Sequence, residues 1–399
     1  MINKRVVVFV STLSFSQNTT AGYNRIINYA KALAIHSTTV ILFSFYGNFN
    51  DIKDLEKISD NIYRIKEKIK AKGSYLKFIF SLNRIKKYLK NYNTCFILYP
   101  TSKFGADIIF LIIFKIFSSN KIFLEINELR RAYPKNRYPE RTLYFKFLRI
   151  IKNLIDIFFY KILEYSSSFY NGILVISTNL YSYYSKYNKK ILLIPILIDF
   201  TEKKNNNLSS VKDSFNIGFF GTVSFRKEGI ENILLVIKNL NRKDINTKLF
   251  LYGPISNVEY EYFQEWLKKE DMTNKIFYNG ILKHDVVLDE MQKMDLLILP
   301  RPHNQQTKYG FSTKLAEYLI SGVPVLVTDV SDNSKYIQDG INGYIVHDIT
   351  PAGFEKKIIE ILKNYEKTKY KITQEAYNTA KKYFDYRLYA ETLNKFLFD

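Results

Sequence analysis

The sequence is poor in the residues that build disulfide scaffolds and metal sites, with one cysteine, one tryptophan and four histidines among 399 residues. Cys95 cannot form an intrachain disulfide, which is compatible with a reducing cytoplasm. No Asp-x-Asp pair occurs and no His or Cys residues have metal-ligand spacing, so we expect chemistry without a metal or another cofactor. A Walker loop, a Gly-x-Gly-x-x-Gly fingerprint and a Gly-x-Ser-x-Gly elbow are also missing, so these common motifs indicate no function.

Long hydrophobic runs are missing as well. The longest, residues 106–117, is interrupted by Asp107 and Lys115 and is too short to cross a bilayer, so we expect a buried helix there. The first ten residues have the pattern of a short buried strand rather than that of a secretory signal. We therefore expect a cytoplasmic protein that attaches, if at all, peripherally to the inner face of the cell membrane.

Acidic residues are outnumbered by basic ones, 38 against 59, which gives a formal net charge of +21. Such an excess favours anionic partners, such as nucleotide phosphates, an acidic membrane surface or nucleic acid. Basic residues gather with aromatic ones in segments 64–90 and 130–152, and the first has Glu67 as its only acid. Two interpretations remain open: either these segments form exposed basic and aromatic surfaces, or their apolar side chains face a sheet and their lysines face water.

Short apolar runs alternate with helical patterns along the whole chain, which is typical of α/β proteins with parallel sheets. In the first half, strands are predicted at 5–10, 40–45, 96–99, 121–126, 172–177 and 192–195, and helices at 23–35, 74–89, 106–117 and about 140–166. Residues 201–213 have the polar composition of a linker. In the second half, strands are predicted at 217–220, 248–252, 276–278, 296–299, 323–328 and 343–346. This order predicts two doubly wound, Rossmann-like domains, at 1–200 and 214–385.

The segment 299–327 is the most informative part of the chain. It has the pattern of a strand end, a polar loop, a helix at about 312–320 and a second buried strand after Gly322 and Pro324. Loops that lead into a helix N-terminus are common anion sites. Lys314 and Glu317 are three residues apart and so share a helix face, where the cation suits a phosphate and the carboxylate suits ribose hydroxyls.

This segment resembles the donor-binding signature of retaining GT-B-fold glycosyltransferases of the family 4 type, used for bacterial surface polysaccharides. The matching or corresponding positions are Thr307, Tyr309, Gly310, Phe311, Ser312, Thr313, Lys314, Glu317, Tyr318, Ser321, Gly322, Pro324 and Val325. Gly310, Ser312 and Thr313 depart from the family pattern, and Tyr309 stands where many members have a glutamate. The resemblance implies a GT-B architecture in which an acceptor domain and a donor domain face each other across a cleft. It also implies that residues 386–399 return to the first domain.

The resemblance assigns further donor-binding positions near other strand ends. Gly221 follows the first strand of the second half, where a glycine lets backbone approach a ligand. Arg226 and Lys227 follow it, and Lys227 is the stronger candidate for stabilising the leaving diphosphate. Gly280 lies at the position where members of the family contact the nucleotide base. Arg301 and His303 follow the strand at 296–299, at the edge where open α/β sheets bind ligands.

In the first half, the resemblance covers the order of elements rather than motifs. Gly22 ends a hydroxyl-rich loop where the family has a glycine that faces the donor and acceptor, although a plain capped turn fits as well. Asn127 and Glu128 follow the fourth strand at a position that is often histidine in the family, and they are candidates for holding the sugar or the acceptor hydroxyl. Residues 195–199 lack the family's Asn-Gly pair, so we expect them to be structural.

The implied activity is transfer of a sugar from a UDP- or GDP-linked donor to a saccharide or a lipid-linked saccharide, with retention of anomeric configuration and without a metal. Implied partners are the nucleotide-sugar, the acceptor and an anionic membrane surface, with no nucleic acid. Two alternatives remain: a nucleotide-sugar 2-epimerase of the same fold, and a non-catalytic basic protein that binds nucleic acid. No recognised nucleic-acid module supports the second alternative.

Overall fold

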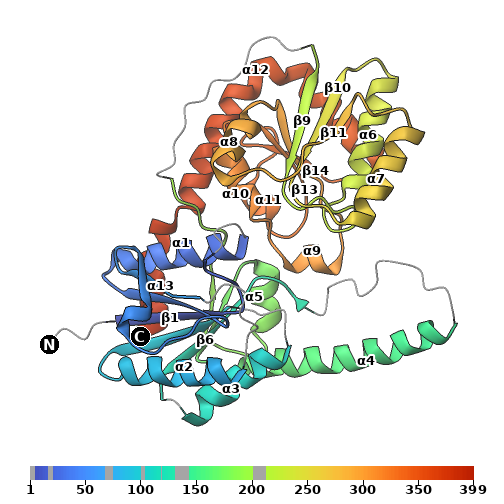
Figure 1. Cartoon of the computed structure of the whole chain (residues 1–399). Helices are drawn as coiled ribbons and strands as arrows, with labels where there is room; N and C mark the ends of the chain where they lie inside the picture. Colours follow the sequence, from blue (N-terminus) through green and yellow to red (C-terminus); the bar gives the residue numbers. More distant parts are fainter. Residues whose placement is uncertain are drawn as a thin grey trace. The chain divides into compact units, whose positions relative to one another are not determined.

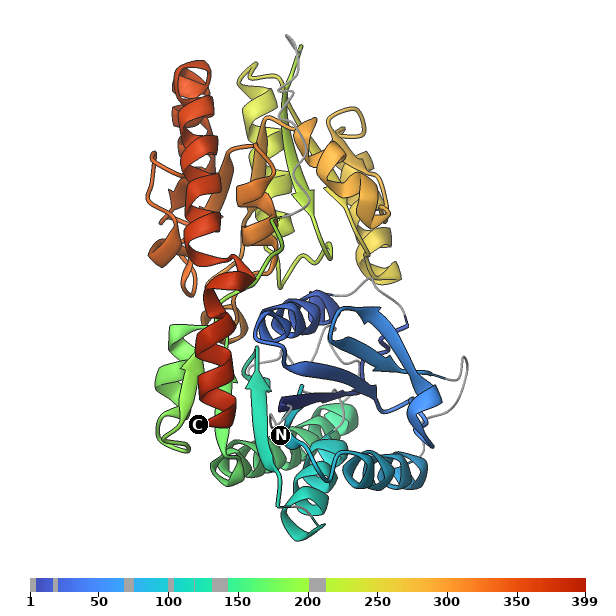
Figure 2. The same cartoon turned by 90° about the vertical axis from the view of Figure 1, so that its left-hand side faces the viewer.

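The computed structural model describes residues 5–16, 21–67, 75–99, 104–117, 119–130, 143–200 and 213–399. The chain divides into two compact units, each with its own parallel sheet (Figures 1 and 2). Unit 1 consists of Met1–Asp199 and Tyr386–Asp399, and unit 2 of Phe200–Asp385.

Unit 1 is built on an eight-stranded sheet in the order β3-β4-β2-β1-β5-β6-β7-β8. Its pairings are parallel except that of β3 with β4. The strands are β1 Arg5–Ser11, β2 Thr39–Ser44, β3 Leu55–Ser59, β4 Ile62–Ile65, β5 Asn93–Leu98, β6 Lys121–Ile126, β7 Gly172–Val175 and β8 Ile191–Leu193. The central strand β1 is buried on both faces beyond its first residue, as expected for a parallel sheet covered by helices on both sides.

Helices cover both faces of this sheet. The helices are α1 Ala21–Ile35, α2 Tyr75–Tyr88, α3 Phe104–Phe117, α4 Leu143–Ser166, α5 Thr178–Tyr184 and α13 Ala390–Phe398. Side chains of α1 and α13 pack into the core on one face, and those of α2 and α3 into the core on the other. The helix expected at 106–117 is α3, and its buried residues include Phe110 and Phe114.

The end of the chain is tied to unit 1 by specific hydrogen bonds as well as by apolar packing. The hydroxyl of Thr38 donates to Asn394 Oδ1 at 2.7 Å, and the thiol of Cys95 donates to the carbonyl of Leu397 at 3.3 Å. Burial raises the pKa of the Cys95 thiol to about 12, so it stays protonated at neutral pH. Leu393 and Leu397 are fully buried in the same core as α1.

Unit 2 has a six-stranded, fully parallel sheet in the order β11-β10-β9-β12-β13-β14. The strands are β9 Phe215–Phe220, β10 Thr247–Tyr252, β11 Ile276–Tyr278, β12 Leu296–Leu299, β13 Val325–Thr328 and β14 Tyr344–Val346. Numbered within the unit, this is the 3-2-1-4-5-6 order of doubly wound nucleotide-binding sheets. The chain reverses its direction of winding between β9 and β12, so the loops after these two strands open at the position where such sheets bind ligands.

The helices of unit 2 are α6 Ile230–Arg242, α7 Asn257–Lys269, α8 His284–Gln292, α9 Gln305–Tyr309, α10 Lys314–Ile320, α11 Asn333–Tyr336 and α12 Pro351–Tyr383. The long α12 packs against α6 and α10. It begins at Pro351, behind Thr350, whose hydroxyl accepts a hydrogen bond from the N–H of Gly353 at 3.2 Å.

The α/β fold class predicted from the sequence is confirmed. The structure differs from the predicted elements in three details. The strands β3 and β4 were not predicted, because most of their residues are at least partly exposed and show no apolar run. The loop expected after β12 contains the short helix α9, whose capping box joins Asn304 and Thr307. The helix expected from about Ser312 begins at Lys314. The expected linker falls almost wholly on residues 201–212, which lie outside the described residues.

The packing of α13 yields a first prediction. Leu393→Ala removes a fully buried side chain from the core, and we expect a loss of roughly 2–5 kcal/mol in the unfolding free energy of unit 1. Leu388→Ala is the matched control, since Leu388 lies in the same terminal segment but is 54% exposed. It should change that free energy by less than about 0.5 kcal/mol. Urea denaturation followed by circular dichroism measures both, and equal effects would contradict the packing of α13.

Candidate functional site

The switch point of unit 2 holds a buried cluster of three charged side chains. Glu228, in the loop after β9, is 2% exposed. Arg301, just after β12, donates from Nε and Nη2 to its two carboxylate oxygens at 3.2 and 3.0 Å. Lys314, the first residue of α10, places its ammonium 2.9 Å from Oε2 of the same carboxylate. Arg301 and Lys314, which follow Glu228 by 73 and 86 residues in the sequence, therefore meet at its carboxylate.

This cluster carries one more positive than negative charge. Burial by itself would raise the pKa of the Glu228 carboxyl, but Arg301 and Lys314 together hold that pKa well below its usual range, so Glu228 is ionised. Burial, together with the charges of Arg301 and Lys227, lowers the pKa of the Lys314 ammonium to about 8, although the charge of Glu228 acts in the opposite direction. An excess cation held in a desolvated setting suits an anionic ligand such as a phosphate.

A glycine makes room for the lysine. Gly221 has a φ of +146°, and a Cβ atom on it would lie 1.8 Å from Cε of Lys314. Gly229 also allows a close approach, because a Cβ atom on it would lie 2.0 Å from the carbonyl oxygen of Pro300. Only residues without a side chain fit at these two positions, so both glycines are needed for the loops after β9 and β12 to approach each other.

The ends of three neighbouring strands are joined in a row by backbone hydrogen bonds. The N–H of Gly221 donates to the carbonyl of Tyr252 at 2.8 Å, and the N–H of Gly253 donates to the carbonyl of Gly280 at 2.7 Å. Gly280 has a φ of +73° and open space around it. The predicted base-reading glycine therefore lies at the same edge of the sheet as Gly221, two strands away.

Tyr318 fixes α10 to the central strand. Its buried hydroxyl accepts a hydrogen bond from the N–H of Phe220 at 2.7 Å and donates to the carbonyl of the same residue at 3.1 Å. Phe220 directly precedes Gly221, so this contact sets the distance between the strand end and the helix that carries Lys314. The ammonium of Lys314 also lies 4.8 Å from the centre of the Phe219 ring, a cation–π contact.

The other predicted donor residues differ in exposure. Arg226 is exposed, whereas Lys227 and Glu317 are half-buried. Tyr309 is half-buried at the end of α9, and His303 is exposed in the loop before it.

Within the stretch 310–313, Gly310 is buried at the end of α9, and Thr313 is half-buried directly before α10. Phe311 belongs to the core, since its ring packs against those of Tyr336 and Phe384 at 5.4 and 6.2 Å. The hydroxyl of Ser312 is buried and has no hydrogen-bond partner among the described residues.

In unit 1, the predicted residues Gly22 and Asn127 meet at Tyr99. The amide of Asn127 donates to the hydroxyl of Tyr99 at 2.7 Å. A Cβ on Gly22 would lie 3.1 Å from that hydroxyl oxygen, so the first turn of α1 passes close to it. The described part of the loop before Gly22 is held by Glu67, whose carboxylate accepts from the N–H of Phe15 at 2.6 Å. Residues 17–20 of this loop lie outside the described residues.

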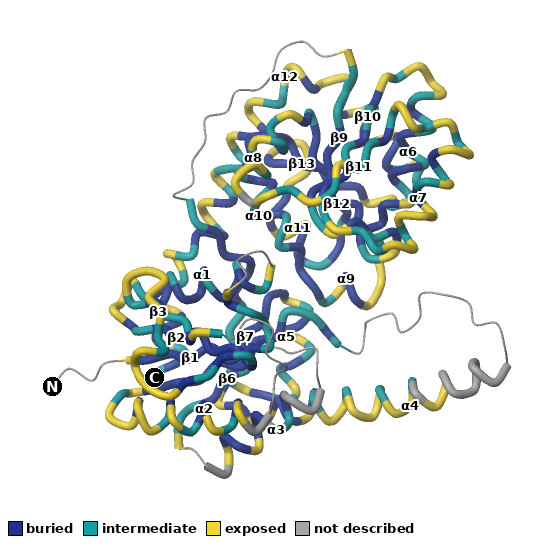
Figure 3. The backbone as a smooth tube through the Cα atoms, in the orientation of Figure 1, coloured by how far each residue is buried: buried dark blue, intermediate teal, exposed yellow. Residues whose placement is uncertain are grey.

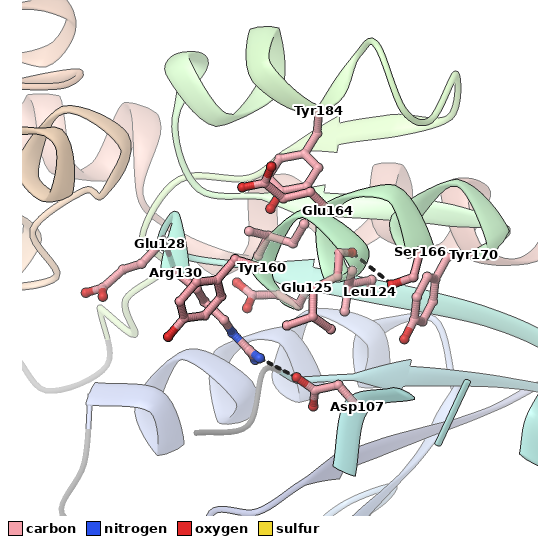
Figure 4. Close-up of a pocket in the computed structure, with 12 residues that line it drawn as sticks. Asp107, Leu124, Glu125, Glu128, Arg130, Tyr160, Glu164, Ser166, Tyr170 and Tyr184 are labelled. Atoms are coloured by element: carbon pink, nitrogen blue, oxygen red, sulfur yellow. Dashed lines mark hydrogen bonds and ion pairs between the residues drawn. The ribbon is translucent and has the colours of Figure 1, made fainter. Parts of the chain in front are cut away.

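The other predicted residue, Glu128, lines a pocket beside the carboxyl end of β6 (Figure 4). The walls come from α3, from β6 and the segment after it, and from the end of α4. Arg130 forms an ion pair with Asp107 across this pocket, and the hydroxyl of Tyr183 donates to Glu164 at 2.6 Å. Carboxylates and tyrosine hydroxyls of this kind can bind the hydroxyls of a saccharide.

Beneath these residues lies a buried ion pair. Arg25 of α1 donates from Nε to Glu125 of β6 at 2.6 Å, and the two side chains are 3% and 0% exposed. The same guanidinium donates to the carbonyls of Pro195 and Ile194 at 2.9 and 3.1 Å. The amide of Asn28 donates to the carbonyl of Leu197. The expectation that residues 195–199 are structural is confirmed, because their backbone holds α1 in place.

Comparison with known proteins decides the family. Residues 200–379 match the family described as Glycosyl transferases group 1. This match spans unit 2 almost to its end, so unit 2 belongs to the group 1 glycosyltransferases. The resemblance to GT-B enzymes of the family 4 type is thereby confirmed, and the residues matched contain the whole charge cluster of unit 2.

An uncharacterized glycosyltransferase of Methanocaldococcus jannaschii is 24% identical to this chain over 162 residues, which cover 41% of this chain and 42% of that protein. The matched part is therefore about two fifths of that relative. Among solved structures, sucrose-phosphate synthase from Thermosynechococcus elongatus superimposes with a TM-score of 0.70 at 13% identity, over 98% of both chains. HepE from Anabaena, in complex with UDP, gives 0.63 at 14% identity, over 98% of this chain and 99% of that one. These likenesses show a shared GT-B fold.

The structure brings together four of the residues that the sequence indicated in the second half of the chain: Gly221, Lys227, Arg301 and Lys314. It also shows a residue that sequence reasoning missed, since Glu228 is the centre of their arrangement. A signal was present, because Glu228 is a carboxylate between Lys227 and a glycine in an otherwise basic loop. The sequence assigned Arg301 and Lys314 to the ligand alone, whereas both also neutralise Glu228.

The contact of Gly221 with Lys314 can be tested by substitution. Gly221→Ala should displace the lysine side chain and lower the affinity for a nucleoside diphosphate, because the new Cβ overlaps Cε. Gly340→Ala is the control: Gly340 also has a positive φ, +73°, but nothing lies within 4 Å of the added atom. It should cost only the left-handed strain of roughly 1–2 kcal/mol in stability. Calorimetric titration compares the two variants, and equal nucleotide affinities would show that Lys314 does not need this space.

The lowered pKa of Lys314 predicts a pH dependence with opposite signs for binding and stability. As pH rises through about 8, the ammonium loses its proton, so the affinity for a nucleoside diphosphate should fall. Between this pH and the ordinary lysine pKa of 10.5, Lys314 binds its proton more strongly in the unfolded chain than in the folded one. The contribution of this lysine to the free energy of unfolding therefore rises with pH. Titrations with a nucleoside diphosphate and with the bare nucleoside at several pH values check the first effect. A fall of the same size for the bare nucleoside would contradict it.

Proposed function

We propose that this glycosyltransferase moves a sugar from a nucleotide-sugar donor to a saccharide acceptor, with retention of the anomeric configuration and without a metal. The observation that supports this most directly is the buried cluster of Glu228, Arg301 and Lys314 at the switch point of unit 2. Its excess positive charge suits the diphosphate of such a donor. Unit 2 is then the donor domain, and unit 1 is the acceptor domain.

The proposed roles follow the positions of the side chains. Lys227 and Lys314 stabilise the charge that develops on the diphosphate as the bond between the sugar C1 and the phosphate oxygen breaks. Glu317, half-buried three residues after Lys314, accepts hydrogen bonds from the ribose. The backbone at Gly280 faces the base. Arg301 acts mainly through Glu228, which fixes the position of Lys314.

In unit 1, Asn127 and Glu128 hold the transferred sugar or the acceptor hydroxyl, and Gly22 leaves space beside Tyr99. The acceptor oxygen attacks C1 on the face from which the diphosphate leaves, and its proton passes to a phosphate oxygen of the leaving group. Because one leaving group serves as the base, this route needs no second carboxylate of the kind that double displacement requires.

The donor is UDP- or GDP-linked in this proposal, and the UDP in the complex of HepE favours the first. The acceptor is a growing saccharide, free or lipid-linked, in the synthesis of capsule, O-antigen or exopolysaccharide. The surplus of basic residues in 64–90 and 130–152 supports attachment to an anionic membrane surface at the cytoplasmic side. Residues 68–74 and 131–142 of these segments lie outside the described residues.

The test is a panel of UDP- and GDP-sugars, assayed for release of the nucleoside diphosphate with and without saccharide acceptors. One donor should be turned over, and nuclear magnetic resonance of the product should show the anomeric configuration of the donor. Turnover of a donor to its 2-epimer without an acceptor would overturn the proposal in favour of an epimerase. Stabilisation by single-stranded RNA instead of nucleotide, in thermal melts, would favour the nucleic-acid-binding alternative.

Glu317→Ala should weaken nucleotide binding by roughly 1.5–3 kcal/mol for each charge-assisted hydrogen bond that the carboxylate makes to the ribose. Glu366→Ala is the control, because Glu366 is also helical in unit 2 but its side chain is 77% exposed and 2.7 Å from Lys369. Calorimetry with UDP and GDP measures both variants. Unchanged affinity in a folded Glu317→Ala protein would remove the ribose role while leaving the proposed reaction intact.

A further inference from the structure

The helix α4 exposes an unusual amount of apolar surface. Nine large apolar or aromatic side chains along it are between 37% and 64% exposed. They are Ile150, Ile151, Leu154, Ile155, Ile157, Phe158, Phe159, Ile162 and Tyr165. Figure 3 shows the resulting run of exposed residues along this helix. In contrast, α2 in the other basic segment buries Phe78, Leu82 and Ile85 in the core.

The exposed residues lie on one side of α4. At about 100° per residue they occupy an arc of roughly 200°, and Lys161 is the one charged residue inside that arc. We call these nine residues the apolar arc. The opposite side carries Asn153, Asp156, Tyr160 and Glu164, which are all buried or half-buried. Tyr160 and Glu164 line the pocket of unit 1, so at this end of α4 the polar side faces the protein while the apolar side is exposed, the reverse of an ordinary surface helix.

The surroundings of α4 in the sequence are strongly basic. Segment 130–152, which leads into the helix, contains eight Lys or Arg residues and a single acid, Glu140. An apolar helix face next to a cationic segment matches the boundary of an anionic bilayer, where apolar side chains enter the acyl region and cations meet the headgroups.

A second copy of the chain fits the apolar arc less well. An arc of roughly 200° is wider than the narrow seam that pairs two helices. Each copy also carries a net charge of +21, so two basic chains would repel each other.

We propose that α4 is an interfacial helix that lies in the plane of an anionic membrane and buries its apolar arc below the headgroups. Among the residues that the structure describes, no helix is both long and apolar enough to cross a membrane, so the helix lies in the surface. The inference deepens the membrane attachment in the proposed function, because it names the inserting element and adds apolar burial to the attraction between charges. It does not depend on which sugar is transferred.

The test is binding of the full chain to vesicles of phosphatidylglycerol and phosphatidylcholine, measured by flotation. Charge attraction weakens as the Debye length falls to about 3 Å at about 1 M salt, whereas apolar insertion persists. We expect measurable binding at high salt, and a loss on the order of tenfold or more in the variant Leu154→Glu with Phe158→Glu. The control is Val258→Glu with Ile341→Glu, which adds the same charge at two exposed apolar positions of unit 2 and should keep wild-type binding.

A spectroscopic reporter separates insertion from a general effect of charge. Trp266 is the chain's only tryptophan, so Phe158→Trp in a Trp266→Phe background places a single fluorophore on the apolar arc. Its emission should shift to the blue on anionic vesicles. Nucleotide binding is measured for every variant to check that the protein is folded. If the proposed function is wrong, nucleotide binding or the donor panel will show it, whereas flotation tests the membrane helix alone.

Three results would overturn the inference. Equal binding by both glutamate variants, abolished by salt, would mean attachment by charge alone. No vesicle binding by the wild-type chain, together with a dimer in sedimentation velocity that Leu154→Glu with Phe158→Glu dissociates, would mean that a second copy covers the arc. No vesicle binding by a monomeric wild-type chain would mean that α4 has no role at a membrane.

Discussion

The burial of the Glu228 carboxylate constrains the edge of unit 2 at which we propose that the donor binds. A charge removed from water requires opposite charges and hydrogen bonds close to it, and Arg301 and Lys314 supply both. Because these residues follow β12 and open α10, their positions tie the loops of the two central strands to each other. The missing side chain at Gly221 is part of the same constraint, since the lysine passes through the space that a Cβ would fill.

Unit 1 is also held together by a buried ion pair, but the balance of charge is different. Arg25 and Glu125 form a buried pair in which one cation meets one carboxylate, and the remaining guanidinium donors meet backbone carbonyls after β8. The cluster in unit 2 has one cation in excess. This difference suits the proposed division of labour, because a diphosphate requires positive charge whereas an uncharged saccharide requires hydrogen-bonding groups around a neutral site.

The sequence predicted most of the strands because each is a short, buried, apolar run, and such runs are visible without knowledge of their neighbours. The run of valines in β1 and the buried residues of β12 are examples. Prediction failed for β3 and β4, whose partly exposed residues are held by pairing rather than by apolar burial. It also left open which way the basic and aromatic segments face. The structure answers this differently for two helices, since α2 buries an apolar side that includes Phe78, Leu82 and Ile85, whereas α4 exposes its apolar side.

The sequence by itself determined the α/β class, the order of elements and the residues at the ends of the strands, because these depend on local patterns and on motifs within about thirty residues of chain. Only the tertiary structure decided that Glu228 is the partner of Arg301 and Lys314, since 73 and 86 residues separate them in the chain. It also decided that the apolar arc of α4 has no covering element among the described residues. A helical pattern shows that one side is apolar, but only the positions of all other elements show whether that side is covered.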